Sequence, residues 1–443
     1  MSRRFTGGPG TERNRPIPVT LTRVYVAAES FGFNCYVGAD RLVFPWRDHV
    51  VTGYLDDREP RALVFDSQLR ASVPMGGIAD LAAEINEWNR ERLGPTLSLR
   101  VGDDGGILLR SRAAILVGPE LGDEQLADMV RGAMETSVLA VGTLALSFPE
   151  LELPGAGELP DEAHDRQEAD ALNGPLPRDR HRRQVTEIDG LDEETAVAEL
   201  HAALDRREET AGEGAEPDAG DGGGEVAGRL YENEQLSLFH PPEEQPPLFD
   251  LDEADGRTAG TGSRAGSPVS RGRVGQQEPQ STDEEDDTTM NARHSAADHG
   301  ELPDPVTVDR IRDVLMGLGV EKTRGGEDVI IAWINEVLFG FFLDNGPSYL
   351  VKGHWDPDLD PEGDFLRIFL LCNDWNEAAV TTKAFCHEDE DGLQVRVEFT
   401  TPVAEGLNEA QLEHNTAVAI KQILQAIDSI STDATGESAV AWP

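Results

Sequence analysis

The chain has 443 residues, with 84 acidic and 38 basic side chains and a formal net charge of -46. Apolar residue types make up 38% of the sequence and aromatic types 6%, which is too polar for one continuous core of this length. The charge argues against non-specific binding to nucleic acid or to anionic membranes, because both require basic patches. We therefore expect no direct contact with nucleic acid and none with a membrane.

The cysteines and the N-terminal segment indicate a compartment. Cys35, Cys372 and Cys386 have no CxxC spacing, which excludes a disulfide scaffold and a thiolate zinc site. No apolar stretch follows the opening MSRRFTGGPGTERNRP, and nowhere do about eighteen apolar residues run together. We expect a cytoplasmic protein without a signal peptide or a membrane span.

Composition divides the chain into folded and unfolded parts. Residues 151–303 carry 38 acids and 13 bases in sequence rich in Pro and Gly, which cannot bury enough apolar surface to offset the entropy of ordering. This segment is predicted to be a disordered acidic linker. Residues 16–150 and 304–432 are dense in apolar side chains and are predicted to be folded domains, with disordered tails at 1–15 and 433–443.

The two flanks are copies of each other. A shift of 287 positions aligns residues 20–105 with residues 307–392 without a gap, so that Trp46 meets Trp333. The strongest stretch aligns Asn86-Glu-Trp88-Asn89 with Asn373-Asp-Trp375-Asn376, and a one-residue deletion then pairs Gln125-Leu126 with Gln411-Leu412. We conclude that the chain contains a duplicated domain of normal size.

Periodicity predicts the order α-β-β-β-α-β-β-α in each copy. A helix opens each copy before Gly32 or Gly319, and an antiparallel meander follows. Asp104-Gly105 and Asp391-Gly392 indicate a hairpin before the last helix. The remaining predicted ranges are strands at 41–46, 50–55 and 61–66, with 329–334, 337–343 and 348–354 in the second copy, middle helices at 78–92 and 364–377, and final helices at 122–146 and 408–430.

These features together resemble the YbjN domain family of bacterial sensory-transduction regulators, whose fold is similar to that of type III secretion chaperones. The resemblance rests on the first helix, the strand ending at Trp46 or Trp333, the Asn-x-x-Asn end of the middle helix and the Asp-Gly hairpin. It covers both flanks and none of the linker. It implies two α+β modules that bind proteins or regulate, without catalytic residues. The first copy departs from the second at the entry to the middle helix, where it has Pro74-Met-Gly-Gly77.

The asparagines of the motif allow two interpretations. Asn86 and Asn89, like Asn373 and Asn376, lie three residues apart and share one helical face, which could form a polar binding patch. The interpretation we favour is that they end the helix and hydrogen-bond the neighbouring hairpin. The tryptophans at 46, 88, 333 and 375 are predicted to be core anchors rather than ligand platforms.

No pattern in the sequence predicts catalysis, a cofactor or a metal. Residues 356–364 resemble a calcium loop, but Pro361 stands where the turn glycine belongs and Arg367 where the bidentate Glu is required. The ten histidines are scattered, and the nucleotide-binding and nucleophile-elbow motifs do not occur. We expect a protein that is not an enzyme.

The linker carries one short motif, Gln235-Leu236-Ser237-Leu238-Phe239, which resembles the pentapeptide with which bacterial proteins bind the DNA polymerase sliding clamp. An apolar cluster in an acidic disordered tract is accessible to a partner's pocket. The same cluster, with the weaker echo Leu248-Phe249, also fits docking on the chain's own domains or on another protein. A second stretch, residues 191–204, has amphipathic spacing and could fold as a helix on binding.

The sequence therefore predicts a non-enzymatic protein-binding or regulatory protein with two α+β modules, joined by a linker that presents short motifs. The two copies can pair as an intramolecular pseudo-dimer, because one chain raises their effective concentration. The competing hypothesis is an adaptor of the sliding clamp that acts through residues 235–239.

Overall fold

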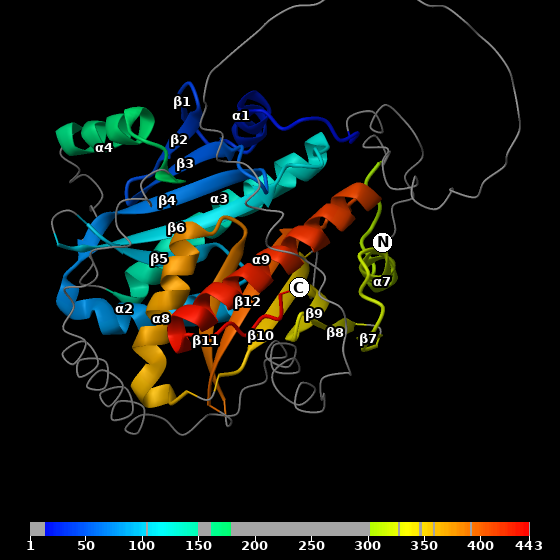
Figure 1. The fold of residues 1–443 in the computed structure, drawn as a ribbon. Helices are drawn as coiled ribbons and strands as arrows, with labels where there is room; N and C mark the ends of the chain where they lie inside the picture. Colours follow the sequence, from blue (N-terminus) through cyan, green and yellow to red (C-terminus); the bar gives the residue numbers. More distant parts are fainter. Residues whose placement is uncertain are drawn as a thin grey trace, which may run out of the picture.

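The computed structural model describes residues 14–102, 105–148, 161–178, 302–326, 328–344, 348–357, 359–389 and 392–442. Within these ranges the chain forms two copies of an α+β domain, each with one antiparallel sheet, which confirms the predicted fold class (Figure 1). The linker residues 235–239, with Gln235, Leu236, Ser237, Leu238 and Phe239, lie outside the described residues, as do residues 191–204.

The first repeat follows the predicted order and adds a two-residue edge strand. Its sheet has the strand order β1-β2-β3-β4-β6-β5, so β1 and β5 are the edges. Its elements are α1 (Leu21–Ser30), β1 (Tyr36–Val37), β2 (Arg41–Pro45), β3 (His49–Asp56), β4 (Ala62–Val73), the 3-10 turn Met75–Gly77, α2 (Ile78–Glu91), β5 (Thr96–Val101), β6 (Ile107–Leu116) and α3 (Asp123–Ser147).

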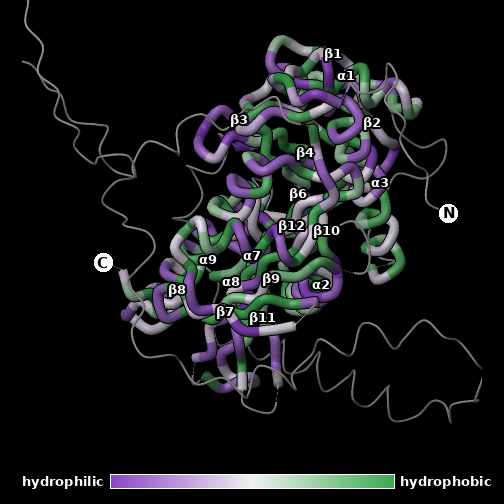
Figure 2. Tube along the Cα trace, turned by 90° about the vertical axis from the view of Figure 1, so that its right-hand side faces the viewer, coloured by the Kyte–Doolittle hydropathy of each residue, from purple (hydrophilic) through white to green (hydrophobic). Residues whose placement is uncertain are grey.

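The second repeat is built in the same way. Its sheet has the order β11-β12-β10-β9-β8-β7, with β7 and β11 at the edges. In Figure 2, β1 and α1 of the first repeat lie at the top and β7, β8 and β11 of the second lie at the bottom. Its elements are α7 (Val308–Gly317), β7 (Thr323–Arg324), β8 (Val329–Ile334), β9 (Val337–Asp344), β10 (Ser348–Trp355), α8 (Pro361–Ala378), β11 (Thr382–Asp389), β12 (Gly392–Pro402) and α9 (Glu409–Thr435).

The opening helices are fixed by residues that the two copies share. Thr20 accepts a hydrogen bond from the backbone N–H of Arg23, and Thr307 does the same for Arg310, which satisfies a free donor at each helix start. The guanidinium of Arg23 also donates to the carbonyls of Ile17, Pro18 and Leu121. These bonds tie the first helix of the repeat to the segment that precedes its last helix.

The long helix of each repeat covers one face of its sheet, which we call the inner face. In the first repeat Leu63 and Phe65 of β4 pack with Val130 and Met134 of α3. In the second, the hydroxyl of Tyr349 lies 3.0 Å from that of Thr416 on α9. Helix α3 is long and apolar enough to cross a membrane by length and composition alone, which is weak evidence, because buried core helices pass the same test.

The strand registers correct the gapless alignment of the two copies. Arg41 lies opposite Tyr54, and Val329 lies opposite Phe342, so β2 and β3 match β8 and β9 at a shift of 288 rather than 287. Ala62 lies opposite Leu116, and Ser348 opposite Pro402, so β4 and β6 match β10 and β12 at a shift of 286. A one-residue shift moves a strand residue to the other face of the sheet. An ungapped sequence comparison hides the two changes of register. One shift is a residue longer and the other a residue shorter than 287, and at α2 the two copies align again at 287.

The two tryptophans that the alignment paired are therefore not equivalent. Trp46 packs against the inner-face cluster of the first repeat, as predicted for a core anchor. Trp333 lies between Ala332 and Ile334, which belong to the core of the second repeat, so its own side chain points to the opposite face. We call this opposite face the outer face. The structural partner of Trp46 is Ile334.

The predicted linker begins too early. Residues 161–173 form helix α4 (Asp161–Asn173), which packs on the first repeat although it lies inside the predicted 151–303 linker. Arg41 donates to the carbonyls of Ala171 and Gly174 at 3.2 and 2.8 Å, and Leu176 is 6% exposed. The acidic composition of this helix hid its role, because much of its docking uses backbone carbonyls.

The C-terminal segment also differs from the predicted disordered tail at 433–443. Helix α9 continues to Thr435 and ends at Gly436 with a φ of +82°. Beyond it Val440 is buried, and the N–H of Ala441 donates to the carbonyl of Asn335 at 3.0 Å. The last described residues therefore close the core of the second repeat.

Candidate functional site at the junction of the repeats

The first asparagine of each motif binds the other repeat. The carboxamide of Asn86 on α2 donates to the carbonyl of Cys386 at 3.0 Å and accepts from the N–H of Cys386 at 2.8 Å. Asn373 on α8 makes the same pair with Leu99, at 3.0 and 2.8 Å. The two contacts are equivalent under exchange of the repeats. They form a reciprocal clasp across the junction.

The second asparagine of each motif binds its own hairpin, as the favoured interpretation of the sequence proposes. Asn89 bonds both backbone groups of Leu97 at 2.9 Å. Asn376 bonds those of Ala384, with Nδ2 to the carbonyl at 2.8 Å and the N–H to Oδ1 at 2.7 Å. Each Asn-x-x-Asn pair therefore reaches two different strands, one in its own repeat and one in the other.

The two asparagine pairs satisfy the free edges of both sheets. Strand β5 is the edge of the first sheet, and its residues Leu97 and Leu99 are bonded by Asn89 and Asn373. An exposed edge presents unpaired N–H and C=O groups that can pair with another chain. Here side-chain amides form hydrogen bonds with these backbone groups of β5, and side-chain amides form the same bonds with β11. The junction thus removes one aggregation-prone edge from each repeat.

The tryptophans between the asparagines support the same region. Trp88 is 6% exposed and its indole N–H donates to the carbonyl of Pro95 at 2.9 Å. Trp375 donates to the hydroxyl of Thr382 at 3.1 Å. Both bonds fix the loop between the middle helix and the edge strand of the same repeat. The apolar cores also meet here, since buried side chains of both repeats belong to one cluster.

A pair of glutamines forms a second reciprocal contact. Gln125 and Gln411 exchange two side-chain hydrogen bonds, at 3.0 and 3.1 Å. Gln125 also donates to the carbonyl of Gly406 at 2.8 Å, and Gln411 to that of Glu120 at 2.9 Å. Each glutamine thereby joins the start of the last helix in one repeat to the loop before that helix in the other.

Buried charged side chains of the first repeat contact the C-terminal end of α8. Asp66 binds Arg110 at 2.6 Å, Arg112 at 3.0 Å and the hydroxyl of Tyr54 at 2.6 Å. Burial, followed by the charge of Asp66, raises the pKa of Tyr54 far above its ordinary value. From the second repeat, Glu377 lies 3.4 Å from Arg110. Arg112 also donates to the backbone carbonyls of Glu377 and Ala379.

Two of these positions carry the opposite charge in the second repeat. Lys352 occupies the place of Asp66 and Glu398 that of Arg112, and their side chains lie 2.8 Å apart. Lys383 lies 3.0 Å from Glu398 and donates to the carbonyl of Arg92 at the end of α2. Burial would raise the pKa of Glu398, but Lys383 and Lys352 outweigh it and lower that pKa. A cation therefore meets the C-terminal end of the other repeat's middle helix on both sides.

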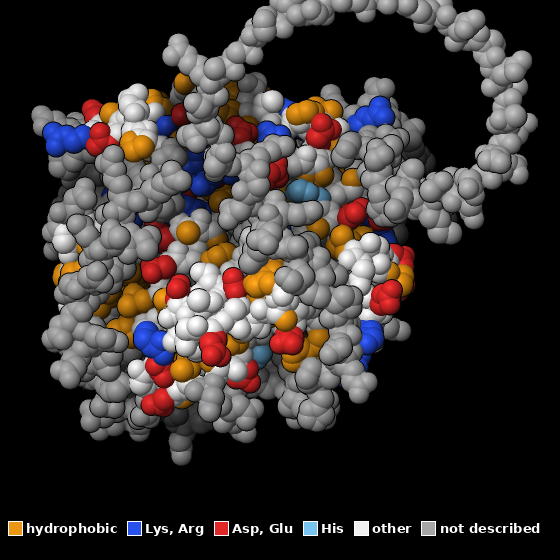
Figure 3. Space-filling view, in the orientation of Figure 1, with side chains coloured by type: hydrophobic (Ala, Val, Ile, Leu, Met, Phe, Trp, Pro, Cys, Tyr) orange, Lys and Arg blue, Asp and Glu red, His pale blue; other side chains and the backbone are white. Residues whose placement is uncertain are grey.

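The described residues do not form a metal site. Within the described ranges no group of three or more His, Cys, Asp or Glu side chains is placed to hold a metal ion. In the segment that resembles a calcium loop, Asp364 pairs with Arg367 at 2.7 Å and accepts from the N–H of Asp360. Acidic and hydrophobic side chains are interspersed over the described part of the face in Figure 3.

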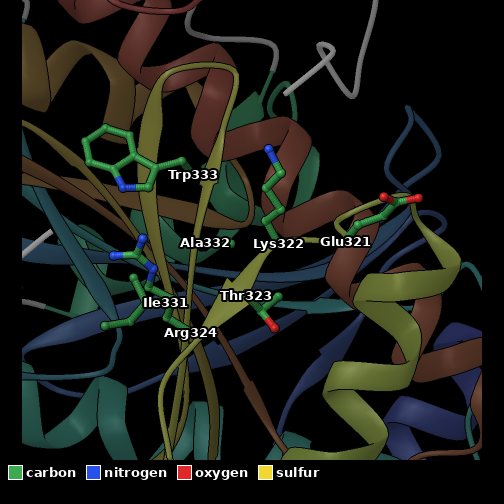
Figure 4. A pocket seen from close by; sticks show the side chains of 7 residues that line it. All are labelled: Glu321, Lys322, Thr323, Arg324, Ile331, Ala332 and Trp333. Atoms are coloured by element: carbon green, nitrogen blue, oxygen red, sulfur yellow. The ribbon is translucent and has the colours of Figure 1, made fainter. Parts of the chain in front are cut away.

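A pocket of about 290 Å³ lies at the β7–β8 edge of the second repeat. It is lined by Glu321, Lys322, Thr323, Arg324, Ile331, Ala332 and Trp333. Figure 4 shows the side chains of Ile331, Trp333 and Arg324 on the same side of the two strands. The indole N–H of Trp333 is buried and has no hydrogen-bond partner among the described residues. The core-anchor interpretation therefore fails for this tryptophan, because its strand register turns it outward.

Comparison with known proteins agrees with this two-copy architecture. A family model described as "YbjN: Putative bacterial sensory transduction regulator" matches residues 20–140 and 307–431, which is more than half of the chain. The chain is also similar to a solved structure described as "YbjN, a putative transcription regulator from E. coli", with 20% identity, covering 28% of this chain and 91% of that chain, at a TM-score of 0.25. No curated protein matches the sequence.

Proposed function

Because the chain belongs to the YbjN family, we propose that it is a non-enzymatic regulator that acts in the cytoplasm by binding another protein, with its two repeats working as one paired unit. The reciprocal bonds of Asn86 and Asn373 support the pairing. They occupy one edge of each sheet, so a partner must use the surfaces that the pairing leaves free.

One free surface carries the proposal, namely the segment from α1 to β1 in the first repeat, which we call the α1–β1 patch. Val26, Phe31, Tyr36 and Val37 of this patch are 57%, 40%, 51% and 63% exposed. Strand β1 is an edge of the first sheet, and exposed apolar side chains on a free edge favour addition of a partner strand. A protein with an extended apolar segment fits this surface.

The second repeat lacks such a patch at the same place. Asp313 stands where the first repeat has Val26, and Arg324 stands where it has Tyr36. Charged side chains at an edge oppose pairing with another chain. This difference between the two repeats supports partner binding by the first.

Capture of partners from lysate tests the α1–β1 patch. The double variant Tyr36→Ser/Val37→Asp should lose a partner that the unaltered chain retains, because a charge replaces the apolar contact. Leu146→Asp is the matched control, since Leu146 is exposed elsewhere on the first repeat and its variant should retain the partner. If the patch variant and the control retain the same proteins, the patch does not carry the function.

The alternative function is an adaptor of the DNA polymerase sliding clamp, supported by the sequence of residues 235–239. Purified clamp should then bind the immobilised chain, and Leu238→Ala/Phe239→Ala should weaken that binding at least tenfold. Leu248→Ala/Phe249→Ala removes the weaker echo and should leave the affinity unchanged. Absence of clamp binding by the unaltered chain would exclude the adaptor.

A further inference from the structure

Over β8, β9 and the start of β10 the outer face of the second repeat is apolar. Strand alternation and pairing place Ile331, Trp333, Leu338 and Leu350 on this face, since their neighbours along each strand belong to the core below α9. Ile331, Leu338 and Leu350 are 5%, 7% and 5% exposed. Among the described helices, α7 lies against β8 and β9, and its buried side chains belong to the inner core.

The first repeat shows how such a face is covered. Its equivalent surface holds Tyr54 and Val64, which pack with Leu176 directly after α4. Arg41 holds the C-terminal end of α4, and Arg70 donates to Gln167 at 2.7 Å. Helix α4 thus lies on the outer face of the first sheet, with polar contacts around a small apolar centre.

The same positions of the second repeat are more apolar. Val329 replaces Arg41, Ile331 replaces Val43 and Leu350 replaces Val64. A helix that covers this face therefore needs more apolar side chains than α4 has. The pocket at its edge is lined by two bases, Lys322 and Arg324, and one acid, Glu321, so its charge favours acidic side chains on the covering segment.

We propose that residues 191–204 of the same chain dock as a helix on the outer face of the second repeat, as α4 docks on the first. Val197, Leu200 and Leu204 share one helical face, and Asp192, Glu193 and Glu194 supply the acidic start. Asp-Glu also opens α4, whereas in this segment it follows Leu191. Its position after Arg178 leaves about 40 Å of extended chain between the last described residue of the α4 segment and the start of this one.

This docking is independent of the proposed partner-binding function, because it uses neither the α1–β1 patch nor residues 235–239. It gives each repeat a covering helix from the same linker. Such a short helix is marginal alone in water, so it would form only on the face that receives it. Tethering raises its local concentration, and a weak contact is enough.

A labelled peptide of residues 188–207 tests the docking by fluorescence anisotropy. It should bind saturably to a chain from which residues 188–207 have been deleted. It should bind at least tenfold more weakly to the full chain, whose own segment occupies the face. A peptide carrying Leu200→Asp and Leu204→Asp should bind at least tenfold more weakly, and this variant does not disturb folding of the protein.

Any one of four results would overturn the proposal. The first is no binding of the peptide to the deleted chain. The second is equal binding to the deleted and the full chain, which would place the peptide elsewhere. The third is unchanged binding when Trp333→Glu is introduced into the deleted chain, with circular dichroism verifying that this chain is folded. The fourth comes from competition with a second peptide, of residues 231–251. If this peptide displaces the labelled one at a lower concentration than unlabelled residues 188–207 do, the face belongs to that other segment instead.

Discussion

The carboxamide of Asn86 bonds both backbone groups of Cys386, a residue 300 positions away in the sequence. Asn373 makes the equivalent contact with Leu99. Each of these asparagines bonds the backbone of an edge strand in the other repeat. Pairing of the repeats therefore also protects one edge of each sheet from pairing with another chain. Duplication of the domain within one chain therefore produces an interface that has the form of a symmetric dimer.

We predict that Asn86→Ala/Asn373→Ala separates the repeats. Each change leaves one N–H and one C=O of an edge strand unpaired, at about 2–4 kcal/mol per asparagine. With a protease site introduced between residues 205 and 230, the cleaved halves of the unaltered chain should elute together in gel filtration. The halves of the double variant should elute apart. Co-elution of the variant halves would show that the asparagines do not hold the junction.

Charge reversal at the junction gives a second prediction. Glu377→Arg places a like charge against Arg110, whose side chain is 10% exposed, and should lower the free energy of unfolding by about 3 kcal/mol. Arg90→Glu is the matched control, because Arg90 has the same place on α2 and its ion pairs among the described residues are with Glu87 and Glu91 near the end of the same helix. Urea denaturation measures both. A loss of stability in the control as large as that in Glu377→Arg would contradict the assignment.

The sequence predicts most elements of this fold and one part of the junction. The helix and strand patterns, the hairpins and the Asn89 and Asn376 bonds follow from local periodicity and from the preference of Asn for helix ends. Asn86 and Asn373 lie on the same helical faces, yet their partners belong to the other repeat. Periodicity gives the face of a side chain but not which copy of the domain meets it.

Two errors have the same kind of cause. The alignment pairs Trp46 with Trp333 by identity. The strand pairs instead show a shift one residue larger than that of the alignment up to β3, and one residue smaller from β4. Only hydrogen-bond partners reveal such a slip, because β3 and β9 carry apolar side chains on both faces. Helix α4 was assigned to the linker because its own side chains are acidic, while the residues that hold it, Arg41 and Arg70, lie far away in the sequence.

Loss of the α4 contact should destabilise the first repeat. Leu176→Ala removes a side chain that is 6% exposed and packs with Tyr54 and Val64, at about 2–3 kcal/mol. Leu146→Ala, at a side chain that is 84% exposed, should change the free energy of unfolding by less than about 0.5 kcal/mol. Chemical denaturation compares them. Equal stability of Leu176→Ala and the unaltered chain would mean that residues 161–178 do not dock in solution.

We predict that His414 makes the stability of the protein depend on pH. Its ring lies so close to the first repeat that a Cβ added at Gly118 would be 3.0 Å from Nε2. Burial lowers the pKa of His414 below its ordinary 6.5, and attraction to Glu59 offsets only part of this. Above pH 6.5 the ring is neutral in the folded and unfolded chain, so the full stability is present. As the pH falls below 6.5, the unfolded chain takes up the proton first and stability is lost until the lowered pKa is passed.

The pH dependence should therefore diminish in His414→Gln, which keeps a polar side chain of similar size without a proton to gain. We expect the melting temperature of the unaltered chain to fall further between pH 7.5 and 5.5 than that of the variant. The difference between the two proteins isolates His414, because every other titrating group is common to both. Parallel falls in the two melting temperatures would show that His414 takes up its proton equally well in the folded chain, and that its contact with Gly118 does not exclude the charged ring.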